Sequence, residues 1–278
     1  CLVGSEMCIR DSTKPACAEP PSNYSPLKVP GTVVKDIDGL EAGTNHGRAA
    51  DKYVYSASVV NQWLEKPSTQ LKNKKIVFVT FDDGPTTKFT GEQLDNLEKA
   101  GARATFFMIP PQMRDVGKNM LSRSLKMGNA LAIHSYSHDY KYLYHGSAAN
   151  KAKHISCDWD WAMAQSRAIL GSNYFSSAFR YPGGHMSWTN LSQADATLAK
   201  RGVGWIDWNA MSGDADAQRP TTVPGYLQMV KKSIKESNNP NVVVILNHDT
   251  YGKQMTAKAM PSILAWLKSQ GYEFGVIA

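Results

Sequence analysis

The stretch TFDDGP at residues 80–85 decides how the rest of the sequence is interpreted. It follows the apolar run IVFV at 76–79, whose β-branched and aromatic residues predict a buried β-strand. The Gly-Pro pair at 84–85 predicts a turn directly afterwards. Asp82 and Asp83 therefore stand side by side where a buried strand is expected to end, and ionised carboxylates are rarely buried without a partner. We expect a cationic group beside at least one of them.

A second stretch, HSYSH at residues 134–138, follows the apolar run ALAI at 130–133. Histidines four residues apart share one face if the strand passes into a helical turn. Two neutral imidazoles and one carboxylate form a three-ligand metal site that leaves positions open for water. A lone histidine is more often a surface or core residue, but the paired spacing and the two aspartates favour a metal site that either Asp82 or Asp83 completes.

Three further stretches follow apolar segments in the same way. They are RYPGG at 180–184, the pair Asp207-Trp208, and LNHD at 246–249, which closes the strand-like run VVVI at 242–245. No one of these strings is specific alone. In barrels and open α/β sheets, however, active sites form where parallel strands end. Five such stretches at predicted strand ends indicate a catalytic site.

Strand-like and helix-like segments alternate along most of the chain. We expect helices at residues 56–65, 90–100, 112–127, 158–170, 191–201, 223–237 and 256–270, and further strands at 102–109 and 272–277. This alternation predicts a parallel, barrel-like α/β fold. The length of 278 residues suits a barrel, which commonly needs about 250 residues.

With these motifs the chain resembles the polysaccharide deacetylases of the NodB-homology type, which are carbohydrate esterases of family 4. The resemblance covers residues 72–278 and includes all five family motifs in order, of which those at 80–85 and 134–138 are the most specific. It implies a distorted (β/α) barrel with about seven parallel strands. It also implies a metal-dependent hydrolase that acts on linear amide C–N bonds.

The resemblance further implies a role for each chemically capable residue. A divalent metal, zinc first and cobalt or another transition metal otherwise, would be held by Asp83, His134 and His138. Asp82 would be the general base, with Arg180 orienting it and balancing its charge.

On the leaving-group side, the resemblance makes His248 the general acid and Asp207 the carboxylate that holds it. Tyr181 would offer its backbone N–H to the oxyanion, and the substrate pocket would be lined by Tyr181, Trp208 and Leu246. From the residues alone, Asp207 could instead cap the following turn, and Trp208 and Leu246 could be core residues. Near the motifs, no direct role is expected for Asp139, His185, Asp214 and Asp249.

Residues 1–71 precede the region that carries the motifs and are interpreted separately. Residues 1–12 resemble translated adapter sequence, and Ala16-Cys17-Ala18 resembles a signal-peptide cleavage site, so we interpret 1–18 as an artefact plus the remnant of a truncated signal peptide. Residues 19–71 are expected to be a linker and an N-terminal extension that either packs on the barrel or acts as a tether. Setting aside Cys1, Cys8 and Cys17 leaves Cys157 alone, which predicts no intramolecular disulfide.

The formal charge of +7 suits a secreted or wall-associated bacterial enzyme that meets an anionic polymer, and the alternative is that the surplus lysines serve only solubility. No nucleic-acid-binding signature and no membrane-spanning apolar stretch is visible, and we expect a monomer. The expected substrate is an acetylated polysaccharide. Peptidoglycan N-acetylglucosamine comes first, with chitin oligomers and then acetylxylan as alternatives. A non-catalytic glycan-binding module is the alternative class, but every catalytic position is filled.

Overall fold

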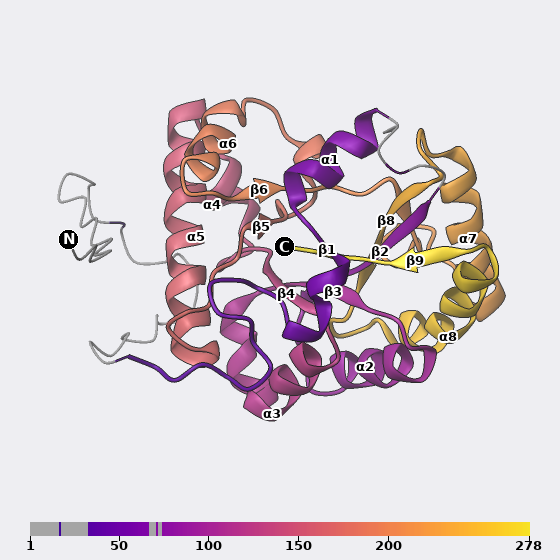
Figure 1. Ribbon diagram of the computed structural model, residues 1–278. Helices are drawn as coiled ribbons and strands as arrows, with labels where there is room; N and C mark the ends of the chain where they lie inside the picture. Colours follow the sequence, from indigo (N-terminus) through magenta and orange to yellow (C-terminus); the bar gives the residue numbers. More distant parts are fainter. Residues whose placement is uncertain (1–16, 18–32, 67–70, 72–73) are drawn as a thin grey trace.

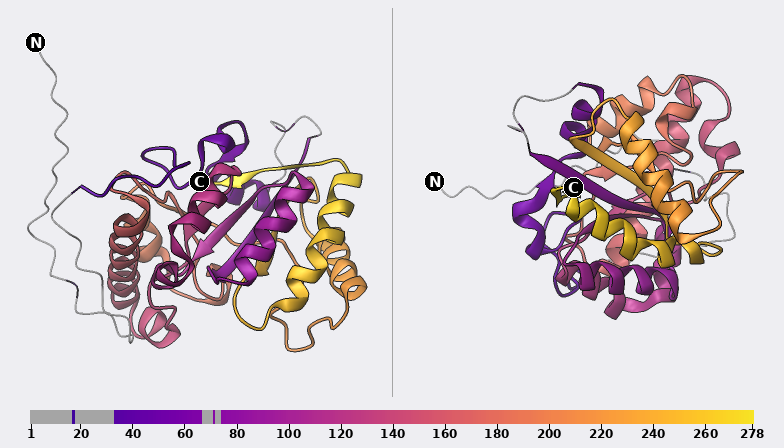
Figure 2. Two further views of the ribbon diagram at one scale, coloured as in Figure 1. Left: turned by 90° about the horizontal axis from the view of Figure 1, so that it is seen from below. Right: turned by 90° about the vertical axis from the view of Figure 1, so that its right-hand side faces the viewer.

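The computed structural model describes residue 17 and residues 33–66, 71 and 74–278. A curled parallel sheet runs through it, and helices surround the outside (Figure 1, Figure 2). Along the sheet the strands follow the order β6 (Gly204–Trp205), β5 (Ala178–Phe179), β4 (Ala130–Ile133), β3 (Ala104–Met108), β2 (Lys75–Gly84), β8 (Val242–His248) and β7 (Ala210–Met211). The outer helices are α2 (Phe89–Ala100), α3 (Met113–Lys126), α5 (Ala148–Leu170), α6 (Ser192–Ala199), α7 (Val223–Glu236) and α8 (Gln254–Ser269). The predicted fold class, a distorted barrel with about seven parallel strands, is confirmed.

Both faces of the sheet are buried, as the continuous apolar runs predict for parallel strands. Along β2, Ile76 and Phe78 pack inside the barrel, whereas Val77 and Val79 pack outward against the helices. Because side chains alternate along a strand, Asp82 lies on the inner side. On the neighbouring strand β8 the same alternation carries His248 inward. The parallel register then sets Asp82 directly opposite His248.

The barrel is closed by a short connection rather than by a continuous ladder. The two ends of the strand path, β6 and β7, are joined by residues 206–209 alone, so the sheet has to curl until its edges meet. Asn209 fixes this connection, because its side chain donates to Val242 O at 2.8 Å and accepts from Val244 N at 2.9 Å. Helix α1 (Ala57–Glu65) contacts β6 and β8 and adds Trp63 to the inner core.

Residues 33–56 cover the end of the barrel opposite the motifs. They include η1 (Arg48–Tyr53) and β1 (Val54–Tyr55), which pairs with the last strand, β10 (Val276–Ile277). The backbone of His46 forms an antiparallel bridge with Ala130 at the start of β4. Strand β9 (Tyr272–Phe274) pairs with the first residues of β2. The described part of the expected N-terminal extension therefore packs on the barrel, while residues 18–32, which contain the expected linker, lie outside the described residues.

A disulfide joins Cys17 to Cys157 in α5, with a Cα–Cα distance of 5.6 Å. The prediction of no intramolecular disulfide was therefore wrong. It failed because Cys17 was assigned to a removed segment, and because its partner lies 140 residues away, where spacing carries no signal. In the described part of the chain, no helix combines the length and the apolar character that a membrane span requires.

The predicted helices and strands are largely present, and the differences have local causes. Helix α5 begins at Ala148, ten residues before the expected start, because Ser147 caps it by accepting a hydrogen bond from Asn150 N at 3.2 Å. Helix α3 is interrupted at Gly117, whose φ of +73° is not helical. The two-residue strand β7 and the short helix α4 (Tyr140–Tyr144) were not predicted, since neither is long enough to show a period.

Candidate active site

Both aspartates of β2 approach the ring of His134, because the strand contains a bulge. Asp82 pairs with Phe107 and Gly84 pairs with Met108, so Asp83 is the extra residue between them. Its φ of +67° lies in the left-handed region. The sequence predicts that the strand ends at the pair, but β2 continues through Gly84. Gly84 is required here because a Cβ would come within 2.2 Å of Asp249 Oδ1.

Asp83, His134 and His138 meet as a group of three ligand atoms that lie within 4.8 Å of one another. Oδ1 of Asp83 is 3.3 Å from His134 Nε2 and 3.1 Å from His138 Nε2. This oxygen is buried and accepts no hydrogen bond in the part of the chain that the structure describes. Burial on its own raises the pKa of Asp83. The two histidines lower it by more than burial raises it, so the pKa lies below its ordinary value and the carboxylate stays ionised. An orphaned carboxylate oxygen facing two imidazole nitrogens fits a divalent cation.

The loop that carries the two histidines is not the helical turn that we expected. His138 has a φ of +48°, and the loop is held instead by Asp158 of α5. This fully buried carboxylate accepts four hydrogen bonds, from the backbone N–H groups of Tyr136 and Ser137 and from the hydroxyls of Ser135 and Ser137. Sequence reasoning missed Asp158. The available signal was an acidic residue one position before Trp159, on the buried side of a long helix.

His134 is oriented by the chain that carries Arg180. Its Nδ1 lies 2.8 Å from the backbone oxygen of Arg180. Because a carbonyl oxygen can only accept, Nδ1 carries the proton in this contact, and the lone pair of Nε2 faces Asp83. This is the usual arrangement of a histidine that binds a metal.

Arg180 is completely buried, which rules out the alternative of a surface arginine. Its Nη1 donates to Asp82 Oδ1 at 2.8 Å and to Thr80 Oγ1 at 2.6 Å. Backbone oxygens of residues 206 and 207 accept two further hydrogen bonds, and the Phe107 ring lies 4.1 Å from the guanidinium carbon. Asp82 is only 2% exposed, so the guanidinium is the charge partner that its burial requires.

His248 is held by Asp214, and the expectation that Asp207 holds it is corrected. Nδ1 of His248 lies 2.8 Å from Asp214 Oδ1, and the backbone N–H of His248 donates to the other oxygen at 2.8 Å. Burial on its own lowers the pKa of His248, but the hydrogen bond with Asp214 and the charges of Asp214, Asp82 and Asp83 raise it to about 8. Sequence reasoning passed over Asp214 because it stands in a loop seven residues beyond Asp207.

Asp207 serves the neighbouring loop. Its carboxylate accepts hydrogen bonds from His185 N at 2.8 Å and from Met186 N at 2.9 Å, at the start of η4 (His185–Ser187). Asp207 therefore caps a turn, as the alternative interpretation expected, but the turn at residues 185–187 precedes it in the sequence instead of following it. The correction has a geometric cause. Both carboxylate oxygens of Asp207 accept from backbone N–H groups of the η4 loop, whereas Asp214 Oδ1 lies 2.8 Å from His248 Nδ1.

The three residues expected to line the substrate pocket lie around the same end of the barrel. Among the described residues, the backbone N–H of Tyr181 donates no hydrogen bond, whereas its hydroxyl donates to Asp195 at 2.8 Å. The Trp208 ring centroid is 5.6 Å from the Arg180 guanidinium carbon, and the same indole would meet a Cβ at Gly184. Leu246 lies two residues before His248 on the same inner side of β8 and is 8% exposed.

Comparison with known proteins agrees with this geometry. The family described as polysaccharide deacetylase matches residues 69–200. The structure of a Streptococcus mutans CE4 esterase has a TM-score of 0.79 and 39% sequence identity, and the match covers 88% of this chain and 100% of that one. The chain belongs to the polysaccharide deacetylase family. The resemblance drawn from the five motifs is thus confirmed, and as a polysaccharide deacetylase the protein is a hydrolase.

Two further relatives differ in how much of their own length this chain covers. A peptidoglycan-N-acetylglucosamine deacetylase of Bacillus cereus is 28% identical over 204 residues, which are 73% of this chain and 69% of that protein. A bifunctional xylanase/deacetylase of Pseudobutyrivibrio xylanivorans is 30% identical over 76% of this chain. This polysaccharide deacetylase spans only 31% of the length of that second relative.

Proposed function

We propose that the protein removes N-acetyl groups from N-acetylglucosamine units of peptidoglycan, with Asp82 as general base and His248 as general acid. One observation carries the proposal. The three potential metal ligands, the Asp82–Arg180 pair and the His248–Asp214 pair meet at one end of the barrel. Nε2 of His248 lies 3.9 Å from Asp83 Oδ2, and Asp82 Oδ2 lies 3.8 Å from His134 Nε2, so the acid and the base flank the ligand group.

Asp83, His134 and His138 would hold the divalent cation, which we propose to be zinc before cobalt or another transition metal. Held by these residues, the cation would supply a nucleophile strong enough for an amide, because metal binding lowers the pKa of water from about 15.7 towards about 7. The buried Asp83 Oδ1, which has no hydrogen-bond partner in the described part of the chain, supports this assignment.

Asp82 would take the proton from the attacking water. Its Oδ1 is engaged by Arg180, and that leaves Oδ2 to face the ligand group as the accepting atom. Arg180 thereby compensates the negative charge of Asp82 and fixes the rotamer of its side chain. A positioned general base of this kind contributes about 10²–10⁴-fold to the rate.

Tyr181 would stabilise the tetrahedral intermediate through its backbone. The side chain is anchored by Asp195 on the outer side of the sheet, so the N–H next to Arg180 is held in place. A preorganised donor costs no reorganisation when the oxyanion forms. The acetyl methyl group would then lie between Trp208 and Leu246, which supply the apolar surface beside this donor.

His248 would protonate the departing amine. With its pKa raised to about 8, the imidazole is largely protonated near neutral pH and still acidic enough to release the proton. Asp214 would take the orienting role that the resemblance implies for Asp207. Its carboxylate accepts from the ring, from the His248 backbone and from Thr256 Oγ1, so it cannot rotate away.

Peptidoglycan comes first as the substrate because the Bacillus cereus relative bears that activity in its name. The net charge of +7 supports an anionic polymer, and the disulfide between Cys17 and Cys157 supports a secreted or wall-associated location. Chitin oligomers remain the nearest alternative. A second candidate function is the hydrolysis of O-acetyl esters such as those of acetylxylan, which is favoured by the xylanase/deacetylase relative.

The test is acetate release from peptidoglycan, chitooligosaccharide and acetylxylan, measured before and after treatment with a chelator and again after zinc is restored. We expect release from peptidoglycan that the chelator abolishes and zinc recovers. Faster release from acetylxylan would instead favour the esterase. Absence of release from all three with metal supplied would overturn the proposal and leave a glycan-binding module.

A further inference from the structure

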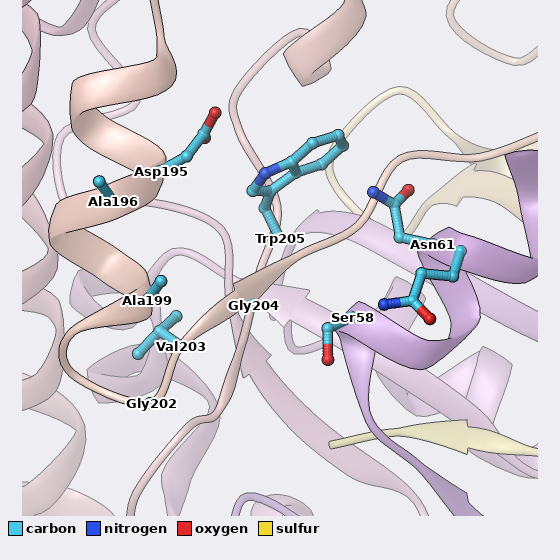
Figure 3. Close-up of a pocket in the computed structure, with 10 residues that line it drawn as sticks. Ser58, Asn61, Asp195, Ala196, Ala199, Gly202, Val203, Gly204 and Trp205 are labelled. Atoms are coloured by element: carbon cyan, nitrogen blue, oxygen red, sulfur yellow. The ribbon is translucent and has the colours of Figure 1, made fainter.

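A groove of about 580 Å³ lies between α1 and α6, on the outside of the edge strand β6. Figure 3 shows the indole of Trp205 between Asp195 of α6 and Asn61 of α1. None of the residues that line this groove is a proposed metal ligand, base or acid. Its volume falls within the roughly 300–1,000 Å³ of typical small-molecule sites.

The groove is kept open by small residues on two sides. Ala196 and Ala199 face it from α6, and Gly204 forms its floor on β6. A Cβ at Gly204 would lie 3.1 Å from the backbone nitrogen of Ser58, so the glycine also lets α1 approach the strand closely. The packing of α1 against the barrel therefore brings the polar side of this helix to the rim of the groove.

The polar groups at the rim have unused hydrogen-bonding capacity. In the described part of the chain, the side-chain amides of Asn61 and Gln62 make no hydrogen bond, and neither does the indole N–H of Trp205. Each amide offers both a donor and an acceptor, and the indole offers a donor beside an apolar surface. A solvated helix face would also expose amides, but it would not place them opposite a half-buried tryptophan across a cavity.

Trp205 is held rigidly in this position. The ring of His185 stacks on it with centroids 3.8 Å apart and an angle of 2° between the planes. Nε2 of His185 in turn contacts Asp195 at 3.0 Å, and the same carboxylate accepts from the hydroxyl of Tyr181. An aromatic side chain that is fixed before binding loses little conformational entropy when a ligand arrives.

This cluster also links the groove to the candidate active site. Tyr181 reaches Asp195 through its side chain, while its backbone lies next to Arg180 of the candidate active site. The backbone of His185 is fixed by Asp207, whose own backbone oxygen accepts from Arg180. The groove and the candidate active site thus share one short stretch of chain, residues 180–186.

We propose that this groove binds a pyranose unit of the polysaccharide at a distance from the scissile acetamide. A pyranose presents an apolar C–H face and a rim of hydroxyl groups, which match an indole bordered by two free amides. The inference rests on the proposed function, since it takes the polymer to be the substrate. Its consequence is that a long glycan binds more tightly than a short one, because two sites on one chain act together.

The experiment measures sedimentation with peptidoglycan sacculi in the Asp82→Asn background, in which the polymer is not consumed. We expect the double substitution Asn61→Ala/Gln62→Ala to raise the apparent dissociation constant about tenfold, as the loss of two neutral hydrogen-bonding side chains implies. Trp205→Ala should weaken binding at least as much. Glu65→Gln, an exposed change on the same helix away from the groove, is the matched control and should bind like its parent.

Unchanged sedimentation of the double variant would overturn the proposed sugar site. This holds even if Trp205→Ala weakened binding, because the Trp205 substitution also disturbs His185. The proposed function is tested separately, by acetate release from the unsubstituted protein. If the protein released acetate and the double variant bound as well as its parent, the sugar site in the groove would be refuted and the deacetylase activity would stand. If the double variant bound more weakly and the unsubstituted protein released no acetate, the sugar site would stand and the deacetylase activity would be refuted.

Discussion

In each half of the candidate active site a buried aspartate positions histidine side chains, but the two aspartates do so through different contacts. In the metal half, formed by the ends of β2 and β4, the buried Asp158 holds the backbone and hydroxyls of the histidine loop and touches neither ring. In the acid half, at the end of β8, Asp214 bonds to the ring of His248 itself. The first arrangement fixes where ligands stand, and the second also sets the pKa of the group that it holds.

The largest expected effect comes from His134→Ala in the metal half. Loss of one of three protein ligands should remove the metal and lower turnover by at least about four decades. Metal analysis of the purified protein together with acetate release would check this. A variant that kept stoichiometric metal would show that the ligand set is wrongly assigned.

Asp82→Asn should separate metal binding from chemistry within that half. The amide keeps the size of the side chain and can still contact Arg180, but it cannot accept a proton from water. We expect turnover to fall by about 10²–10⁴-fold while the metal content stays at the unsubstituted level. Normal turnover would refute Asp82 as the base.

Asp214→Asn should test the acid half. Burial already lowers the pKa of His248, and only its carboxylate neighbours raise it to about 8, so removal of the Asp214 charge lowers that pKa. The general acid then loses its proton at lower pH. The alkaline limb of the pH–rate profile should move to lower pH, with a loss of about 10² in rate and no change in metal content.

Asp207→Asn is the matched control for that prediction, because it makes the same chemical change on the carboxylate that holds η4. Its alkaline limb should stay where it is in the unsubstituted protein. If Asp207→Asn moved the limb and Asp214→Asn did not, the first assignment of Asp207 would be restored.

Asp158→Ala should give the smallest loss of rate and the clearest contrast with Asp214. Two backbone N–H groups and two hydroxyls lose their acceptor, so the histidine loop relaxes. Metal affinity should fall by about 10–100-fold, while saturating metal restores most of the turnover and the pH profile is unchanged. A titration of metal against activity measures this, and a shifted pH profile would break the distinction between the two halves.

The metal half could be predicted from the sequence because each ligand belongs to a contiguous motif. The Asp82–Asp83 pair and the two histidines four residues apart carry their chemistry in their spacing, and strand periodicity places them at one edge of the sheet. The conformation of the histidine loop could not be predicted, because it depends on Asp158, twenty residues beyond His138 in a different element. Asp214 was missed for the same reason, and so was the disulfide partner of Cys17.

By itself, the sequence determined most of the strands and helices in chain order, the parallel sheet and the residue types at the strand ends. These depend on local periodicity and on neighbours within a few residues, which a single chain displays directly. Only the tertiary structure decided which buried carboxylate orients which imidazole, and that Asp83 is the bulged residue that lets two adjacent aspartates face the same histidine. Such choices depend on the curling of the sheet, which brings loops far apart in the sequence within hydrogen-bond distance.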